Sequence, residues 1–133
     1  MLEYMKFKIG GYIGWETIEI SVINEKYIVK HQKALWADWS VFEDVDLIAW
    51  NTKLENVHIN KWRKEYVNTG ILDGTQWNLE YKVKDKRCRH IYGSNAYPEN
   101  FDDFMKVLGE LYKIIDVQAF WEGDNVVRDF RGD

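Results

Sequence analysis

The beginning of the chain alternates apolar and polar residues with a period of two, and this pattern strongly restricts the fold. Within "MKFKIGGYIGWETIEISVINEKYIVK", Met5, Phe7 and Ile9 alternate with lysines, and the segment from Ile18 to Val22 repeats the pattern. A period of two predicts strands that bury one face of a sheet. A Gly-Gly pair and an Asn-Glu pair stand between the apolar segments, where the chain should turn. The N-terminal third therefore predicts an antiparallel meander.

A second pair of strands is predicted further along the chain. In "TQWNLEYKV", Trp77, Leu79 and Tyr81 alternate with polar residues, and "CRHIY" pairs back on this strand across the charged turn "KDKR". Aromatic and β-branched residues favour strands, so composition and alternation agree. Trp77 is expected to belong to the core. One further short strand is predicted before the turn at Asp73 and Gly74.

Between these two groups of strands, the apolar residues change to a helical period. "SVFE" offers Ser40 as a helix N-cap and Glu43 three positions later, which is the spacing of a capping box. Phe42 and Val45 begin a series of apolar residues at spacings of three. The pattern predicts a helix over about residues 41–55.

A second, strongly amphipathic helix is predicted towards the C-terminal end. Pro98 suits its beginning, because a proline there loses no intrahelical hydrogen bond. Asn100 and Asp103 have the spacing of an N-cap and its return contact. The segment "YPENFDD" is therefore explained mostly as the start of a helix. The apolar residues that follow recur at spacings of three and four, namely Phe101, Phe104, Met105, Leu108, Leu111, Tyr112 and Ile115.

Together these elements predict a single α+β domain over residues 1–133, with an antiparallel sheet of about five or six strands and two helices packed on one face. The only cysteine, Cys88, excludes an internal disulfide framework, and no stretch is long and apolar enough to span a membrane. The first residues lack the features of a signal peptide, so we expect a cytoplasmic protein without a membrane partner. Phe120 and Trp121 are expected to pack back onto the domain.

Two segments of the second half, "ILDGTQWNLEYKV" and "IYGSNAYPENFDDFMKVL", have a familiar spacing. They resemble an arrangement in small uncharacterised bacterial proteins, in which a DGxxWxLE strand precedes a GSNxYPxNF helix start. The similarity covers about residues 62–112 and does not extend to the N-terminal third. No activity is attached to that family, so the resemblance implies a shared fold unit and a bacterial or phage origin. It also implies one structural corner, formed by Asp73, Gly74, Trp77, Gly93, Asn95 and Pro98.

Residues suited to catalysis or metal binding do not cluster in the sequence. Cys88 and His90 share a strand face, but residues two apart on a strand lie about 7 Å apart, too far for a direct hydrogen bond. Glu80 shares its strand face with lysines, which favours a solvated row of salt bridges. The three histidines are isolated, and no C-x-x-C or H-x-x-x-H motif occurs. We therefore expect no enzyme, no metal site and no cofactor.

Tryptophan content and charge distribution favour a protein-binding function. The chain has seven tryptophans and a net charge of −4, and Trp is enriched among the residues that dominate protein interfaces. The stretch "LWADWSVFEDVD" combines two tryptophans with acidic residues and contains no base. We predict a non-enzymatic module that binds another protein, with neutralisation of a basic partner as one form of that function. The predicted contact residues are Trp36, Asp38, Trp39, Glu43, Asp44 and Asp46.

The alternative hypotheses place a binding site on the basic hairpin. "KVKDKRCRHIY" and "KWRK" intersperse lysines and arginines with aromatic rings, which is typical of a groove for single-stranded nucleic acid. The same aromatic rings suit a small ligand such as a sugar or a nucleobase. The acidic net charge disfavours nucleic acid. The residues of this alternative site are Trp62, Lys82, Lys84, Arg87, Arg89 and Tyr92.

Overall fold

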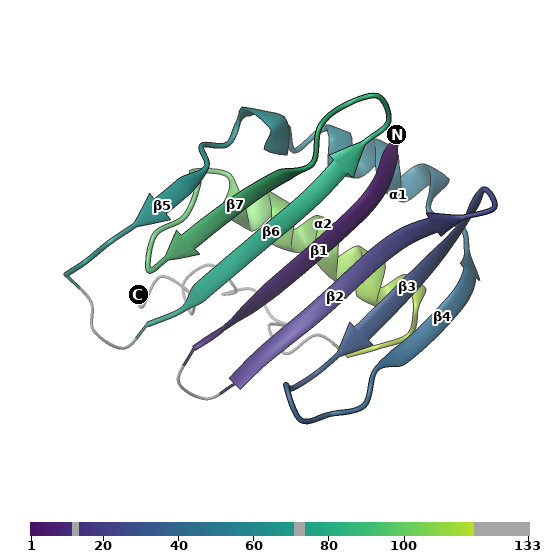
Figure 1. Cartoon of the computed structure of the whole chain (residues 1–133), viewed down its shortest axis with the longest axis horizontal. Coiled ribbons are helices and arrows are strands. Elements are labelled where there is room, and N and C mark those ends of the chain that lie inside the picture. Colours follow the sequence, from purple (N-terminus) through teal and green to yellow (C-terminus); the bar gives the residue numbers. More distant parts are fainter. Residues whose placement is uncertain (12–13, 71–73, 119–133) are drawn as a thin grey trace.

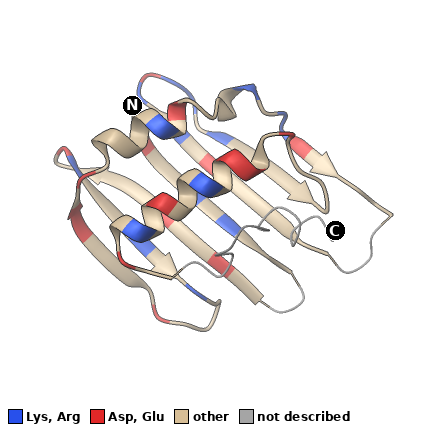
Figure 2. Cartoon of the chain, turned by 180° about the vertical axis from the view of Figure 1, so that it is seen from behind, with Lys and Arg blue, Asp and Glu red and all other residues tan. Residues whose placement is uncertain are grey.

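The computed structural model describes residues 1–11, 14–70 and 74–118 of the chain. Within these ranges, seven strands form one mixed sheet in the order β4-β3-β2-β1-β6-β7-β5, and two α-helices cover one of its faces (Figure 1; Figure 2 shows the helix side). A short 3-10 helix, η1, follows the first α-helix. The elements are β1 (Leu2–Gly11), β2 (Gly14–Ile23), β3 (Lys26–Gln32), β4 (Ser40–Val45), α1 (Ile48–Glu55), η1 (Ile59–Lys61), β5 (Glu65–Val67), β6 (Gln76–Val83), β7 (Arg89–Ser94) and α2 (Phe101–Ile114).

The α+β class is confirmed, and the number of strands is corrected to seven within the described residues. The predicted meander corresponds to β1, β2 and β3, and the predicted hairpin corresponds to β6 and β7. The short strand expected before residue 73 is β5, which lies parallel to β7 and makes the sheet mixed. The unpredicted strand is β4, at one edge of the sheet.

The register places the alternating apolar residues on the face that the helices cover. Phe7 lies opposite Ile18 on β2 and opposite Leu79 on β6, and none of the three is more than 1% exposed. Lys6 and Lys8 point to the opposite face, because successive side chains on a strand alternate. The period of two in the sequence therefore reports the two faces of the sheet.

Trp77 lies in the middle of an aromatic cluster and is 0% exposed. Its ring centroid is 5.1 Å from that of Phe101, 5.9 Å from that of Trp62 and 6.1 Å from that of Tyr66. Aromatic pairs at such distances contribute about 0.5–1.5 kcal/mol each beyond the area that they bury. The cluster joins β6 to α2 and to the segment around β5, as expected of a core residue.

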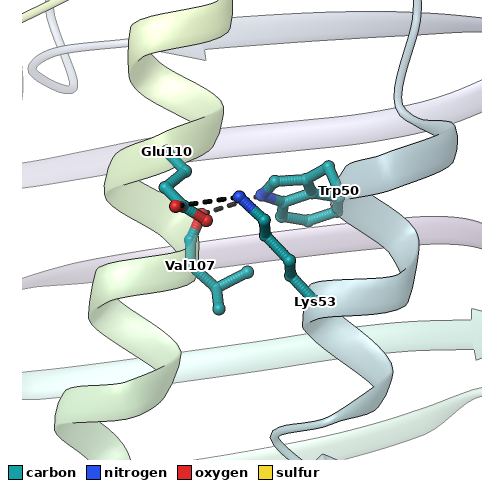
Figure 3. A network of polar contacts seen from close by, with 4 residues as sticks. All are labelled: Trp50, Lys53, Val107 and Glu110. Atoms are coloured by element: carbon teal, nitrogen blue, oxygen red, sulfur yellow. Dashed lines mark hydrogen bonds and ion pairs between the residues drawn. The ribbon is translucent and has the colours of Figure 1, made fainter.

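The two helices contact each other through a partly buried hydrogen bond and an exposed ion pair (Figure 3). Trp50 Nε1 on α1 donates a hydrogen bond to the Val107 carbonyl oxygen on α2 at 2.8 Å. Lys53 Nζ lies 3.0 Å from Glu110 Oε1, with both side chains about half exposed. An exposed ion pair contributes about 0–1 kcal/mol, so Trp50, which is 2% exposed, provides most of this contact.

The helix predicted over residues 41–55 is wrong in its N-terminal half. Ser40–Val45 form the edge strand β4, and α1 begins at Ile48. Ser40 starts a strand, so the predicted capping box is absent. Asp46 instead provides a side-chain contact at the start of α1, where its Oδ1 accepts a hydrogen bond from the Ile48 N–H at 3.1 Å.

A β-bulge explains why β4 resembles a helix in the sequence. Phe42 lies opposite Val29 and Val45 lies opposite Tyr27, so two residues of β4 face one residue of β3. Asp44, one of these two bulged residues, has a φ of 55°. The extra residue puts Phe42 and Val45, three positions apart, on the same face of the sheet, and this spacing imitates a helical period.

Helix α2 agrees with its prediction, but its expected cap is wrong. Asn100 occupies the N-cap position without a side-chain cap hydrogen bond. Its Oδ1 accepts a hydrogen bond from Trp62 Nε1 at 2.8 Å, and its Nδ2 donates to the Val57 carbonyl oxygen at 2.7 Å. The Asn100 side chain therefore ties the start of α2 to the segment that follows α1.

Candidate protein-binding surface

Strand β4 and the connection that precedes it carry large apolar side chains in solvent. Among the described strands, β4 pairs with β3 alone, so its outer edge is unpaired (Figure 1). Trp36 is 80% exposed, and Leu35, Val41 and Trp39 are 54%, 53% and 41% exposed. A cluster of exposed apolar side chains with polar neighbours is typical of an interaction site. We name as the β4 edge surface the residues Leu35, Trp36, Asp38, Trp39, Val41, Glu43, Asp44 and Asp46.

The connection between β3 and β4 is held by its own hydrogen bonds. Gln32 Nε2 donates to the carbonyl oxygens of Leu35 at 3.2 Å and of Ala37 at 3.0 Å. The Ala37 N–H donates to the Ala34 carbonyl oxygen at 3.0 Å, and Ala34 is only 8% exposed. These contacts fix the backbone on both sides of Trp36. The exposed indole is therefore presented by an ordered turn, which lowers the entropy cost of binding.

All six predicted contact residues are exposed, and the structure brings them to one edge of the sheet. Asp44 Oδ1 lies 3.4 Å from Lys26 Nζ, an ion pair with both side chains about two-thirds exposed. Asp46 accepts the Ile48 N–H. Asp38 and Glu43 have no side-chain hydrogen bond or ion pair with another described residue. The surface therefore keeps negative charge that is available to a partner.

The residues of the alternative site do not form one surface. Trp62 is 5% exposed and belongs to the aromatic cluster on the helix-covered face. Lys82 and Tyr92 point to the opposite face, because each alternates with buried residues of its strand. Lys82 Nζ lies 2.8 Å from Glu3 Oε2, so its charge is partly neutralised. A stacking groove that contains both Trp62 and Tyr92 is therefore not formed.

The remaining cations of that alternative site lie at or beside the β6–β7 connection. Lys84 and Arg87 are exposed there. The Arg89 guanidinium turns to the helix side and donates to backbone carbonyl oxygens, including that of Trp62 at 2.7 Å. Arg89 is therefore a structural residue of this fold, and Arg87 keeps an accessible charge.

The structural corner expected from the resemblance is closely packed. A Cβ on Gly93 would overlap the Trp77 indole, and a Cβ on Gly74 would overlap the Asn95 carboxamide. The Asn95 N–H donates to the Thr75 carbonyl oxygen at 2.9 Å, and Asn95 has a φ of 55°. Glycine at these two positions is required because no side chain fits between the strands and the turn.

Two further residues of the corner have different outcomes. Pro98 is buried just before α2. Asp73 lies outside the described residues, and so do Phe120 and Trp121, for which packing onto the domain was expected. Trp77 Nε1 donates to the Ala96 carbonyl oxygen at 3.1 Å, so the corner also satisfies the polar atom of the central indole. These contacts give the corner a role in stability.

A buried polar group on the helix-covered face was missed by the sequence reasoning. Glu16 on β2 and His31 on β3 are 9% and 6% exposed, and His31 Nε2 lies 3.2 Å from Glu16 Oε2. The Tyr112 hydroxyl donates a hydrogen bond to the same carboxylate oxygen. Burial first, and then the Glu16 charge, raise the pKa of Tyr112. The available signal was the alternation itself, since Glu16 and His31 occupy positions in register with buried strand residues.

Cys88, His90 and Glu80, which were considered for catalysis, do not form a common site in the described structure. Cys88 is exposed, and His90 Nε2 lies 3.2 Å from Asn78 Oδ1 on the neighbouring strand. Glu80 lies opposite both Lys6 and His90 on the face without helices. Within residues 1–11, 14–70 and 74–118, no group of three His, Cys, Asp or Glu side chains is placed to hold a metal ion. None of the helices described has the length and apolar character needed to cross a bilayer.

No family model matches the chain, and neither a curated protein nor a solved structure matches it.

Proposed function

We propose that the protein is a non-enzymatic binding module that engages a partner protein through the β4 edge surface. The observation that carries this proposal is the 80% exposure of Trp36 on a turn whose backbone is held by hydrogen bonds. An exposed indole contributes nothing to the core, yet Trp is the residue type most enriched among interface hot spots.

The mode of contact follows from the shape of the edge. The bulge at Glu43 and Asp44 and the acidic side chains around it disfavour the addition of another strand to β4. Contact through side chains is therefore favoured over extension of the sheet. Trp36 and Trp39 provide the apolar anchors of this contact, with Leu35 and Val41 beside them.

The charge of the surface defines the chemistry of the partner. Asp38 and Glu43 carry negative charge without a described neutralising partner, and Asp44 has a solvent-screened one. A partner with a basic contact surface is complementary to this arrangement. The resemblance to small bacterial proteins supports a bacterial or phage origin, and neutralisation of a basic partner is one form that the function takes in this proposal.

The experiment is affinity capture from a lysate of the host, followed by measurement with the purified partner. Three proteins are compared, namely the wild type, Trp36→Ala and Val67→Ala. Val67 is the matched control, because it is a 45% exposed apolar residue on β5, at the other edge of the sheet. We expect one nuclease-resistant protein that Trp36→Ala loses and Val67→Ala retains.

Titration calorimetry then measures the affinity of that partner. Truncation of a hot-spot residue costs about 2 kcal/mol or more, so Trp36→Ala should weaken binding by about thirtyfold. Asp38→Lys should slow association and reduce its salt dependence. Equal affinity of the wild type and Trp36→Ala would refute the proposed surface. Capture that depends entirely on nucleic acid would refute the protein-binding function.

A further inference from the structure

A pocket of about 640 Å³ opens at the end of the sheet where the β6–β7 connection meets the N-terminal end of β1. The C-terminal part of α1 and the helix η1 complete its wall, and these four segments lie together in Figure 1. Its volume falls in the range of small-molecule sites. The apolar lining consists mainly of Leu2, Leu54, Ile59, Tyr81 and Val83.

One side of the pocket is fixed by the Asn51 carboxamide of α1. Asn51 Oδ1 accepts the Leu2 N–H at 3.1 Å, and its Nδ2 donates to Leu47 O at 2.8 Å and to Tyr27 Oη at 3.1 Å. The Tyr27 hydroxyl donates in turn to the Leu2 carbonyl oxygen at 2.8 Å. The polar atoms at this wall are therefore satisfied by the protein. The surface that they leave for a ligand is apolar and preformed.

Arg89 fixes the other side. Its guanidinium donates to the carbonyl oxygens of Ile59 at 3.3 Å, Asn60 at 2.9 Å and Trp62 at 2.7 Å, and to Tyr81 Oη at 2.9 Å. These bonds hold η1 against β6 and β7. Arg89 is therefore part of the pocket wall. Its hydrogen bonds go to the protein, and its positive charge still attracts an anion in the pocket.

The mouth of the pocket is basic, although the protein as a whole is acidic. Lys86 and Arg87 line the pocket, and neither has a side-chain hydrogen bond or ion pair with another described residue. Glu55 is the only carboxylate among the described lining residues. A ligand with one negative group at its end would place that group between Lys86 and Arg87, where charge-assisted hydrogen bonds are strong.

We propose that this pocket binds a small amphipathic anion, namely an unbranched aliphatic chain that ends in a carboxylate. The apolar lining residues include the aliphatic side chains of Leu2, Leu54, Ile59 and Val83, which suit a flexible hydrocarbon chain better than a polar sugar or base. The site shares no residue with the β4 edge surface. It is therefore independent of the proposed protein-binding function, and either can fail without the other.

The test is titration of the full-length ¹⁵N-labelled protein with sodium decanoate, followed by amide NMR. Decanol and decyltrimethylammonium, which have the same chain with no charge and with the opposite charge, are the matched ligands. We expect saturable shifts at the amides of Leu54, Ile59 and Arg87, and much weaker binding of both matched ligands. Shifts that do not saturate, or equal binding of decyltrimethylammonium, would overturn the proposal.

Charge-reversal variants locate the anionic group. The double variant Lys86→Glu with Arg87→Glu should weaken decanoate binding about tenfold or more, as the loss of a charge-assisted hydrogen bond predicts. Lys84→Glu is the control, because Lys84 is exposed on the same connection and does not line the pocket. Trp36→Ala should bind decanoate normally. Unchanged affinity of the double variant, or loss of binding in Trp36→Ala, would contradict the assignment.

Discussion

The Tyr112 hydroxyl on α2 donates a hydrogen bond to the Glu16 carboxylate on β2, although 96 positions separate the two residues in the chain. Both side chains are buried, with exposed fractions of 2% and 9%. A buried carboxylate needs such donors, because desolvation of an unpaired charge is costly. This contact fastens the C-terminal part of α2 to the sheet.

Tyr112→Phe removes only the hydroxyl and should lower the free energy of unfolding by about 1–3 kcal/mol, because Glu16 loses a buried hydrogen-bond donor. Urea denaturation measures the change. Tyr92→Phe, on the face without helices, is the control and should be nearly neutral. If both variants lower the free energy of unfolding by similar amounts, the Tyr112–Glu16 hydrogen bond does not contribute specifically to stability.

Alkaline pH should destabilise the protein through its tyrosines. Burial, followed by the Glu19 charge, raises the pKa of Tyr4 to about 12, and burial with Glu16 raises that of Tyr112. In the unfolded chain tyrosine ionises near its ordinary pKa of 10.0. Above that pH the unfolded state binds fewer protons, so the free energy of unfolding falls as the pH rises. Below about pH 10, the contribution of these tyrosines to the free energy of unfolding is fully present.

Unfolding curves between about pH 8 and pH 11.5 test this dependence. The double variant Tyr4→Phe with Tyr112→Phe should show a shallower loss of stability above pH 10 than the wild type. A pH dependence that is unchanged in the double variant would assign the alkaline loss to other groups.

The tryptophans should separate into two classes. Trp77→Ala should cost about 3–5 kcal/mol, because Trp77 is fully buried among aromatic rings. Trp36→Ala should change the free energy of unfolding by less than about 0.5 kcal/mol, as expected for an exposed side chain. Thermal denaturation of the two variants provides the comparison. A large loss in Trp36→Ala would assign this residue to the fold and not to a contact surface.

Arg89 should be intolerant of replacement by lysine. A lysine keeps the charge but cannot reach several carbonyl oxygens in the geometry of a guanidinium. Arg89→Lys should lower the free energy of unfolding by about 1.5–3 kcal/mol and speed amide exchange around η1. Arg87→Lys, an exposed change nearby, should be neutral. Amide exchange that is equally fast in both variants would contradict the bracing role of Arg89.

Local periodicity predicted most of the fold, because β1, β2, β6 and α2 are long and have one clearly apolar face. In β4 the same periodicity led to a wrong helix, because the bulge gives the apolar residues of this strand a helical spacing. Trp36 lies before the helix that was predicted over residues 41–55, and its contact role was inferred from the acidic stretch around it. The error in the helix therefore did not affect that inference, and Trp36 is 80% exposed. Contacts between residues far apart in the chain leave no local pattern in the sequence. The hydrogen bond from Arg89 to the Trp62 carbonyl oxygen and the assembly of the pocket from four segments therefore could not be predicted.

The central position of β1 has a consequence for how the chain is made. On one side β1 pairs with β2, which follows at once, but on the other side it pairs with β6, where Phe7 meets Leu79. A growing chain on the ribosome therefore displays the apolar face and one open edge of its first three strands while residues up to Leu79 are still being added. The cover from α2 arrives later still. Late closure of this kind slows folding and leaves the apolar face of the nascent meander open to aggregation until the later elements are made.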